Sequence, residues 1–293
     1  MTDKQRLRLA VPTPVVTMLP GAHARWEETA TIEDIARIAE TADRLGYHHL
    51  TCSEHIGVPP SQAARRGGTY WDPLATFGYL AARTGQIRLA TNVLVLGYHH
   101  PLEIAKRYGT LDLISGGRLI LGLGVGTLKE EFELLGAPFD DRGERADDAL
   151  RALVASLSRP EPAYDGTYYK YGGLVVDPCA VQEHVPIWIG GRTLRSLRRA
   201  VRFANGWCPF AVGIEQAQDW LRRVDLPNDF EVRLGPAAPF DPMQHPQGTT
   251  DGLIELAEAG TTIVEARLVH HSLQHYLEQL EALAALAQRS TLA

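Results

Sequence analysis

Short apolar runs alternate along the chain with longer segments in which apolar residues recur every three or four positions. The runs have the length of buried strands, and the periodic segments have the spacing of helices that pack by one face. We therefore predict eight strand–helix pairs. The predicted strands cover residues 7–17, 47–53, 87–96, 119–123, 186–189, 206–210, 230–236 and 262–269. The predicted helices cover residues 32–45, 73–84, 101–115, 142–158, 194–205, 214–224, 250–259 and 273–287.

Eight such pairs in 293 residues predict an α/β fold, a (β/α)8 TIM barrel built as one domain over residues 1–293. Residues 127–141, after the fourth strand, and residues 160–184, before the fifth, are expected to be insertions. A doubly wound sheet is the alternative architecture. Such sheets usually carry a GxGxxG turn after the first strand, and no turn of this kind follows Thr17.

Composition and charge narrow the class of protein. A hydrophobic content of 45% and a charged content of 22% are ordinary for a globular enzyme. The net charge of −6 argues against a nucleic-acid partner, because phosphate backbones attract a basic surface. No apolar run reaches transmembrane length, and the three cysteines lack CxxC spacing. We expect a cytoplasmic protein with no membrane partner.

A glycine turn follows the fifth predicted strand and consists of Gly190, Gly191, Arg192 and Thr193. Because a helix is predicted to start directly after it, free backbone N–H groups and the positive end of the helix dipole point at one spot. The glycines allow a phosphate to approach the backbone closely. We expect an anion site here, and the alternative is a turn with a purely structural role.

Arginines occupy one face of the helix that follows this turn, at positions 195, 198, 199 and 202. Two interpretations are open. The stripe can be the solvated outer face of a barrel helix, or it can guide the polyanionic tail of a cofactor toward the glycine turn.

Polar residues also follow other predicted strands, at the end of a barrel where catalytic groups collect. Glu54 and His55 come directly after the second strand, and we expect His55 to exchange a proton while Glu54 orients it. The alternative is a histidine that only satisfies loop backbone groups. The further candidates are Thr91 and Asn92 in the third strand and Gly124, Val125 and Gly126 after the fourth, whose glycines would let a flat ring lie against the backbone.

Metal binding is not expected. His48 and His49 are neighbours in a predicted strand, so their side chains should point to opposite faces. The adjacent pairs His48–His49, His99–His100 and His270–His271 lack HxH or HExxH spacing, which leaves a metallohydrolase barrel as a minor alternative.

Several short sequence runs follow one another along the chain. They are LGY at residues 45–47, SEH at 53–55, DPL at 72–74, IRLATNV at 87–93, HP at 100–101, TLDLISGGRL at 110–119, GLGVG at 122–126, PIWIGG at 186–191 and ANGW at 204–207. This set resembles the bacterial luciferase-like flavin and deazaflavin oxidoreductases, most of all the actinobacterial members that use coenzyme F420, an 8-hydroxy-5-deazaflavin. The resemblance covers residues 7–212.

The resemblance implies a (β/α)8 barrel, commonly a homodimer, with a flat tricyclic ring at its C-terminal mouth. It implies that the cofactor phosphate lies at the turn of Gly190 and Gly191, and that the family histidine near the ring is His55. It further implies a cis peptide bond between Asn92 and Val93, in a bulge under the ring.

One position departs from the family pattern. Sugar-phosphate dehydrogenases of the family have a carboxylate after the fourth-strand glycines, and Thr127 stands there in this chain. Glu130 and Glu131 follow slightly later, and their position alone does not make them substitutes. A sugar-phosphate substrate is therefore not expected.

These observations predict an oxidoreductase that moves a hydride between coenzyme F420 and a C=C, C=N or C=O bond of a small molecule. A flavin or F420 reductase is the expected source of reduced cofactor. One alternative is an FMN monooxygenase that reacts with O₂ and depends on a separate flavin reductase. The other is a flavin-binding barrel without catalytic activity.

Overall fold

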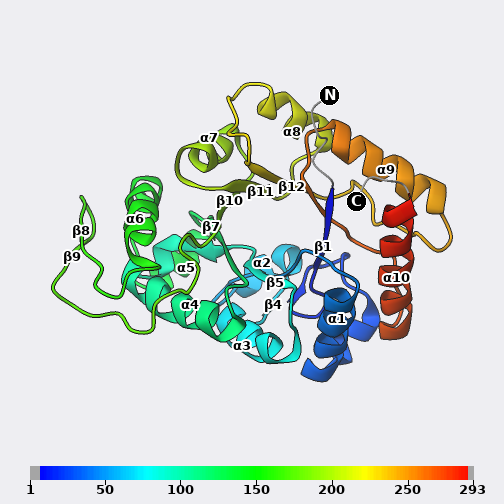
Figure 1. Cartoon of the computed structure of the whole chain (residues 1–293), viewed down its shortest axis with the longest axis horizontal. Helices are drawn as coiled ribbons and strands as arrows, with labels where there is room; N and C mark the ends of the chain where they lie inside the picture. Colours follow the sequence, from blue (N-terminus) through cyan, green and yellow to red (C-terminus); the bar gives the residue numbers. More distant parts are fainter. Residues whose placement is uncertain (1–6, 290–293) are drawn as a thin grey trace.

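Eight parallel strands form a closed barrel in the computed structural model, which describes residues 7–289 (Figure 1). The strands are β1 (Arg8–Pro12), β3 (His49–Cys52), β5 (Arg88–Thr91), β7 (Leu119–Gly124), β10 (Ile187–Gly191), β11 (Gly206–Pro209), β12 (Glu231–Leu234) and β13 (Ile263–Glu265). Each pairs with the next in this order, and β1 pairs with β13 to close the ring. The predicted TIM barrel is confirmed, and the doubly wound sheet is excluded.

The predicted helices form a layer outside the barrel. They are α1 (Ile32–Arg44), α3 (Pro73–Arg83), α4 (Pro101–Ser115), α6 (Arg142–Ser156), α7 (Leu194–Phe203), α8 (Ile214–Leu221), α9 (Pro246–Glu258) and α10 (Leu273–Arg289). Local sequence explains several of their starts. At α3, for example, the Asp72 carboxylate accepts the backbone N–H of Ala75 at 2.8 Å, and Pro73 occupies the first turn.

Smaller elements fill the connections between strands and helices. They are β2 (Thr17–Met18) paired with β4 (Thr69–Tyr70), η1 (Arg25–Thr29), α2 (Pro60–Arg66), β6 (Leu94–Val95), η2 (Leu96–Tyr98), α5 (Lys129–Leu134) and the hairpin of β8 (Tyr164–Asp165) and β9 (Lys170–Tyr171). The hairpin projects beyond α6 at the left of Figure 1. The two predicted insertions are thus confirmed, and they contain α5 and this hairpin.

Two predicted strands are interrupted. The first prediction, residues 7–17, spans β1 and the start of β2, and β2 leaves the barrel to pair with β4. The third prediction, residues 87–96, contains β5, β6 and a break between them at Asn92 and Val93. The peptide bond joining these two residues is cis, as the family resemblance implied.

Small and apolar side chains fill the inside of the barrel next to a polar network. The apolar cluster comprises Ala10, Ala90, Ile120, Trp188, Cys208 and Ile263, with Val93 packed against it. Arg233 is 2% exposed, and its guanidinium lies 2.9 Å from the Glu265 carboxylate. The same guanidinium donates to the Asn92 side-chain oxygen at 2.5 Å. This network connects β12 and β13 to the break after β5.

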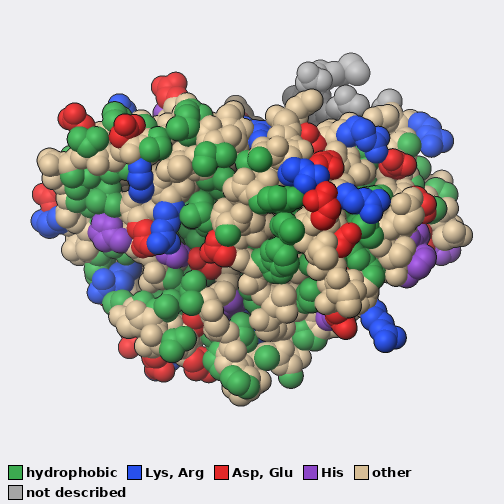
Figure 2. Space-filling view, turned by 90° about the horizontal axis from the view of Figure 1, so that it is seen from below, with side chains coloured by type: hydrophobic (Ala, Val, Ile, Leu, Met, Phe, Trp, Pro, Cys, Tyr) green, Lys and Arg blue, Asp and Glu red, His purple; other side chains and the backbone are tan. Residues whose placement is uncertain are grey.

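The surface carries charges of both signs. Acidic and basic side chains are interspersed on the face drawn in Figure 2, and they do not gather into one basic patch there. Within residues 7–289, no helix is long and apolar enough to cross a membrane.

Candidate active site

The carboxyl ends of the barrel strands bring the predicted site residues to one end of the fold, here called the mouth. Glu54 and His55 follow β3, the Asn92–Val93 bond follows β5, and the glycine turn ends β10. Because all eight strands are parallel, these segments meet at the same edge of the barrel. The residues predicted to form the site therefore lie at one end of the barrel.

His55 faces a carboxylate that is distant in the sequence. Its Nδ1 atom lies 2.7 Å from Oε2 of Glu131, and its ring makes an edge contact with the Tyr70 ring at a centroid distance of 4.6 Å. The expectation that Glu54 orients His55 is wrong. Both residues lie in the irregular segment after β3, and their side chains reach different partners.

Glu131 lies in α5, inside the first insertion, and its side chain is fully buried. The carboxylate accepts four hydrogen-bond contacts, including the Tyr98 hydroxyl at 2.5 Å and the backbone N–H groups of Ile56 at 2.5 Å and Gly57 at 3.1 Å. Burial raises the pKa of this carboxyl, but the hydrogen bonds from His55, Tyr98 and Gly57 outweigh it and the net shift is downward. Glu131 is therefore a buried anion at the mouth.

Glu54 turns away from His55 toward the segment after β5. Its carboxylate lies 2.7 Å from Nε2 of His99 and accepts the backbone N–H of Val95 at 2.7 Å. Burial lowers the pKa of His99, but the hydrogen bond and charge of Glu54 outweigh it and raise the pKa overall. Glu54 also lines a separate small cavity of about 80 Å³ with Asp72 and Arg107. These contacts indicate that Glu54 holds the backbone of β6.

The side chains of Thr91 and Asn92 are engaged inside the barrel. The Thr91 hydroxyl donates to the Gly122 carbonyl oxygen at 2.7 Å, and Asn92 accepts from Arg233. The Ser53 hydroxyl donates to the Asn92 carbonyl oxygen at 2.7 Å. The side chains of Thr91 and Asn92 therefore make hydrogen bonds within the protein, below the mouth.

Val93 occupies the space that two of the glycines leave. A Cβ atom on Gly124 would lie 2.6 Å from Val93 Cγ2, and a Cβ atom on Gly190 would lie 2.6 Å from Val93 Cγ1. The small size of Gly124 and Gly190 therefore also makes room for Val93, and the expectation of a ring against the backbone at Gly124 stays a prediction. The Val93 side chain is half-buried and packs against the apolar cluster inside the barrel. Val125 packs against the core, and the Gly126 carbonyl accepts from Arg142 at 3.2 Å.

The glycine turn after β10 has the strand–turn–helix geometry of an anion site. Gly191 has φ +140°, and Thr193 is the N-cap of α7, with its hydroxyl accepting the Ser196 N–H at 3.3 Å. Arg192 is exposed and forms no ion pair within the described part of the chain. First-turn N–H groups of a helix have no partner within it. The local structure is compatible with a phosphate, and the anion site stays a prediction.

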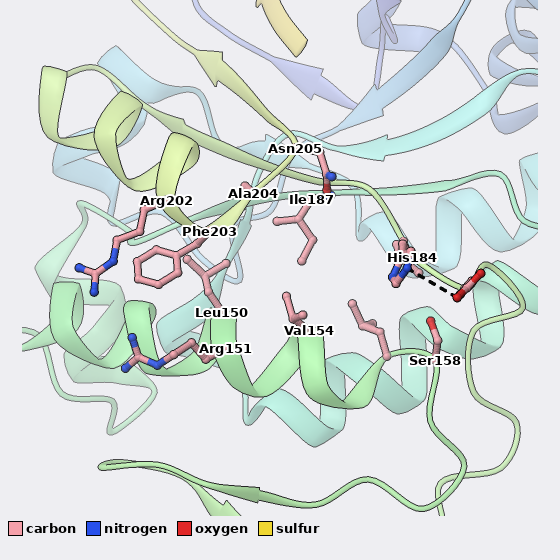
Figure 3. Close-up of a pocket in the computed structure, with 13 residues that line it drawn as sticks. Leu150, Arg151, Val154, Ser158, His184, Ile187, Arg202, Phe203, Ala204 and Asn205 are labelled. Atoms are coloured by element: carbon pink, nitrogen blue, oxygen red, sulfur yellow. Dashed lines mark hydrogen bonds and ion pairs between the residues drawn. The ribbon is translucent and has the colours of Figure 1, made fainter. Parts of the chain in front are cut away.

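Two arginines of the α7 stripe, Arg199 and Arg202, contact other parts of the protein. Arg199 is tied to α6 through Asp147 and the Gly143 carbonyl, and Arg202 lies over the Phe203 ring. Figure 3 shows Arg202 in a cavity of about 480 Å³ between α6 and α7. That cavity includes Ile187, the first residue of β10, and so lies toward the opposite end of the barrel from the mouth. Arg202 is therefore not a guide to the glycine turn.

Arg66 lies beside Thr127, after β7, and is a candidate that the sequence alone did not suggest. One of its terminal nitrogens donates to the Thr127 hydroxyl at 3.3 Å, whereas its buried Nε has no hydrogen-bond partner. Residues 7–289 contain no carboxylate in an ion pair with this guanidinium. Arg66 ends α2 next to a second arginine, and no motif distinguishes it, so only the fold identifies it. The charge of Arg66 is therefore not neutralised by a carboxylate among residues 7–289.

His48 and His49 lie closer together than expected. Their Nδ1 atoms are 2.9 Å apart, because His48 precedes β3 and strand alternation does not apply to it. The prediction that the two rings point to opposite faces is wrong. The residues that the structure describes contain no group of three or more metal-ligating side chains placed to hold an ion.

Comparisons with known proteins agree with this fold. A family model described as luciferase-like monooxygenase matches residues 13–227. An uncharacterized protein of Mycobacterium tuberculosis is 31% identical over 204 residues, which is 64% of this chain and 72% of that protein.

Three solved structures show the same architecture. A monooxygenase from Streptomyces bottropensis has a TM-score of 0.72 at 20% identity, covering 95% of this chain and 98% of its own. The FMN complex of the oxygenating component of 3,6-diketocamphane monooxygenase from Pseudomonas putida has a TM-score of 0.70 at 16% identity, with coverage of 95% and 97%. An F420-dependent secondary alcohol dehydrogenase has a TM-score of 0.71 at 11% identity, with coverage of 95% and 99%.

Proposed function

The chain belongs to the luciferase-like monooxygenase family, and from this premise we propose that it is an oxidoreductase that uses coenzyme F420. It would move a hydride between the deazaflavin and a C=C, C=N or C=O bond of a small organic substrate. Proteins of the same fold are described as complexes with FMN and with an F420 adduct, so both cofactors are compatible with this architecture.

The observation that carries the proposal is that a glycine turn at a helix N-terminus and a histidine–carboxylate pair lie at one mouth. The N-terminus of α7, with Arg192 and Thr193, would bind the cofactor phosphate. Arg66, whose charge no carboxylate neutralises among the described residues, would attract further anionic groups. Coenzyme F420 has a polyanionic tail and FMN a single phosphate, so a second free cation favours F420.

The protein's part in the reaction is positioning and proton transfer. When bound, the deazaflavin would supply the hydride chemistry at its ring C5. Val93 would support the ring, and His55 would give a proton to the substrate or take one from it.

A cofactor titration followed by turnover assays tests the proposal. We expect fluorescence quenching to show at least tenfold tighter binding of F420 than of FMN, a difference of about 1.4 kcal/mol. Reduced F420 should then be oxidised anaerobically by members of a panel of ketones, imines and enones.

Two other results would replace the proposal. Tenfold tighter FMN binding, with O₂-dependent product formation when a flavin reductase is added, would identify an FMN monooxygenase. Binding without turnover of any kind would identify a non-catalytic flavin-binding barrel. The M. tuberculosis relative offers a matched protein for the same titration.

Three further features belong to this proposal. A homodimer in solution, a cytoplasmic location and a reductase that supplies reduced cofactor would each fit an enzyme of this kind. Light scattering of the purified protein tests the first of them.

A further inference from the structure

We infer that Glu131 is a positioning residue that fixes which nitrogen of His55 exchanges the proton. The inference deepens the proposed function, because it assigns the proton transfer of that reaction to Nε2 of His55. It concerns residues of this chain alone, so it can be tested without cofactor.

The four contacts of the Glu131 carboxylate divide between its two oxygens. Oε1 accepts the backbone N–H groups of Ile56 and Gly57, at 2.5 and 3.1 Å. Oε2 lies 2.5 Å from the Tyr98 hydroxyl and 2.7 Å from Nδ1 of His55. Burial, followed by the hydrogen bond to Glu131, raises the pKa of Tyr98, so this hydroxyl keeps its proton and donates it.

An ionised carboxylate oxygen accepts hydrogen bonds and donates none. Since the pKa of Glu131 is lowered, Oε2 faces Nδ1 as an acceptor, and Nδ1 must carry a hydrogen. In the neutral ring the lone pair is then on Nε2. No hydrogen bond joins Nε2 to any residue between 7 and 289, so this nitrogen is available to a ligand. A carboxylate that holds a histidine in this way sets both its tautomer and its orientation.

Packing fixes the helix that carries Glu131. The neighbouring Phe132 is fully buried, and its ring meets the Tyr98 ring at 4.9 Å and the Phe139 ring at 5.2 Å. The Glu131 oxygens connect α5 to the loop after β3 and to η2 at the same time. The first insertion therefore supplies a part of the site.

Glu131→Gln provides a sharp test because the two backbone N–H groups decide how the new amide is oriented. They require an acceptor, so the amide oxygen should take the place of Oε1, near Ile56 and Gly57. The amide NH₂ would then face Nδ1 of His55. Nδ1 would have to accept, and the neutral ring would change to the Nε2–H tautomer.

The readout is the ¹⁵N spectrum of histidine-labelled protein without cofactor, at a pH where the ring is neutral. A spectrum of His55→Asn identifies the His55 signals by their loss. We expect hydrogen on Nδ1 in the wild type and on Nε2 in Glu131→Gln. Tyr98→Phe is the matched control, because it removes the other donor to Oε2 and keeps the carboxylate, so hydrogen should remain on Nδ1.

Two spectral results would overturn the inference. One is a wild-type protein with hydrogen on Nε2, a measurement that stands even if Glu131→Gln does not fold. The other is a folded Glu131→Gln protein with an unchanged tautomer.

Turnover separates this inference from the proposed function. With a working deazaflavin assay, Glu131→Gln should lower kcat about 10²–10⁴-fold, as expected for loss of general acid–base catalysis, with little change in cofactor affinity. Tyr98→Phe should retain turnover within about tenfold of the wild type. If the wild type shows no F420-dependent turnover, the proposed function is wrong. The tautomer assignment is then still decided by the ¹⁵N spectrum.

Discussion

The glycine turn at the end of β10 can be tested by adding one methyl group, in Gly191→Ala. Gly191 has φ +140°, a conformation that residues with a side chain rarely adopt. A Cβ atom there would lie 2.6 Å from Cβ and 2.9 Å from Oγ of Ser196, in the first turn of α7. Ser196 cannot move freely, because its hydroxyl donates to the Thr193 carbonyl and accepts from the Trp207 indole.

Two contributions give the expected loss of stability. Backbone strain of this kind costs about 1–3 kcal/mol, and overpacking by one carbon costs about 1–3 kcal/mol. Partial relaxation of Ser196 should keep the sum near 3 kcal/mol. In large domains, each kcal/mol of lost stability lowers the midpoint of thermal unfolding by roughly 2–4 °C. A loss near 3 kcal/mol should therefore lower this midpoint by roughly 6–12 °C.

The assay is thermal unfolding by circular dichroism beside the matched variant Gly68→Ala. Gly68 has an ordinary φ, and a Cβ atom there would meet nothing within 4 Å, so its midpoint should stay within about 2 °C of the wild type. Gly191→Ala should also weaken F420 binding at least tenfold, since displacing the first turn of α7 moves its N–H groups. Equal midpoints for the two variants would refute the argument from φ and close contact.

Three further predictions concern charges at and under the mouth. His55→Ala should slow turnover about 10²–10⁴-fold at saturating cofactor while cofactor affinity changes little, and a near wild-type rate would remove His55 from the mechanism. Arg233→Ala should lower the free energy of unfolding in urea by about 3–5 kcal/mol, because Glu265 would lose its cation inside the barrel; a loss below 1 kcal/mol would contradict this. Because the pKa of His99 is raised in the folded state, its ion pair with Glu54 should stabilise the protein fully below pH 6.5, and the stabilisation should be lost as pH rises through the folded-state value. The free energy of unfolding in urea should therefore fall less between pH 6 and 9 in Glu54→Gln than in the wild type. Identical pH profiles for the variant and the wild type would show that the ion pair of His99 and Glu54 contributes nothing.

The repeating pattern of apolar residues was sufficient to predict the fold. Strand and helix each impose their own period on the sequence, and proline, aspartate and glycine mark their ends, as Asp72 and Pro73 do at α3. Parallel strands also share a common end, so a list of strand-end residues predicts a site before any distance is known. The interruption after β5 was not visible in apolar periodicity, because residues on both sides of Asn92 and Val93 remain apolar and strand-like.

Partners within the site were harder to predict than its location. His55 and Glu54 are adjacent in sequence, and each pairs with a group far along the chain, Glu131 and His99. The partners lie in an insertion and in a strand–helix connection, where no period or motif constrains the sequence. Which carboxylate meets which imidazole is decided by how α5 and η2 pack over the mouth, and packing of that kind is not encoded in spacing.

The sequence also does not reveal why a glycine stands at a strand end. Such a glycine can make room for a neighbouring side chain, or it can allow a backbone conformation that other residues rarely adopt. Gly124 and Gly190 are small so that the protein's own Val93 can pack between β7 and β10, whereas Gly191 is glycine because of its backbone conformation at the turn. A Cβ atom at either of the first two would displace Val93 and disturb the barrel floor. Weaker cofactor binding in a Gly124 or Gly190 variant would therefore be explained by a displaced Val93 side chain. Gly191, whose substitution acts on the N-terminus of α7, is the position that probes the anion site directly.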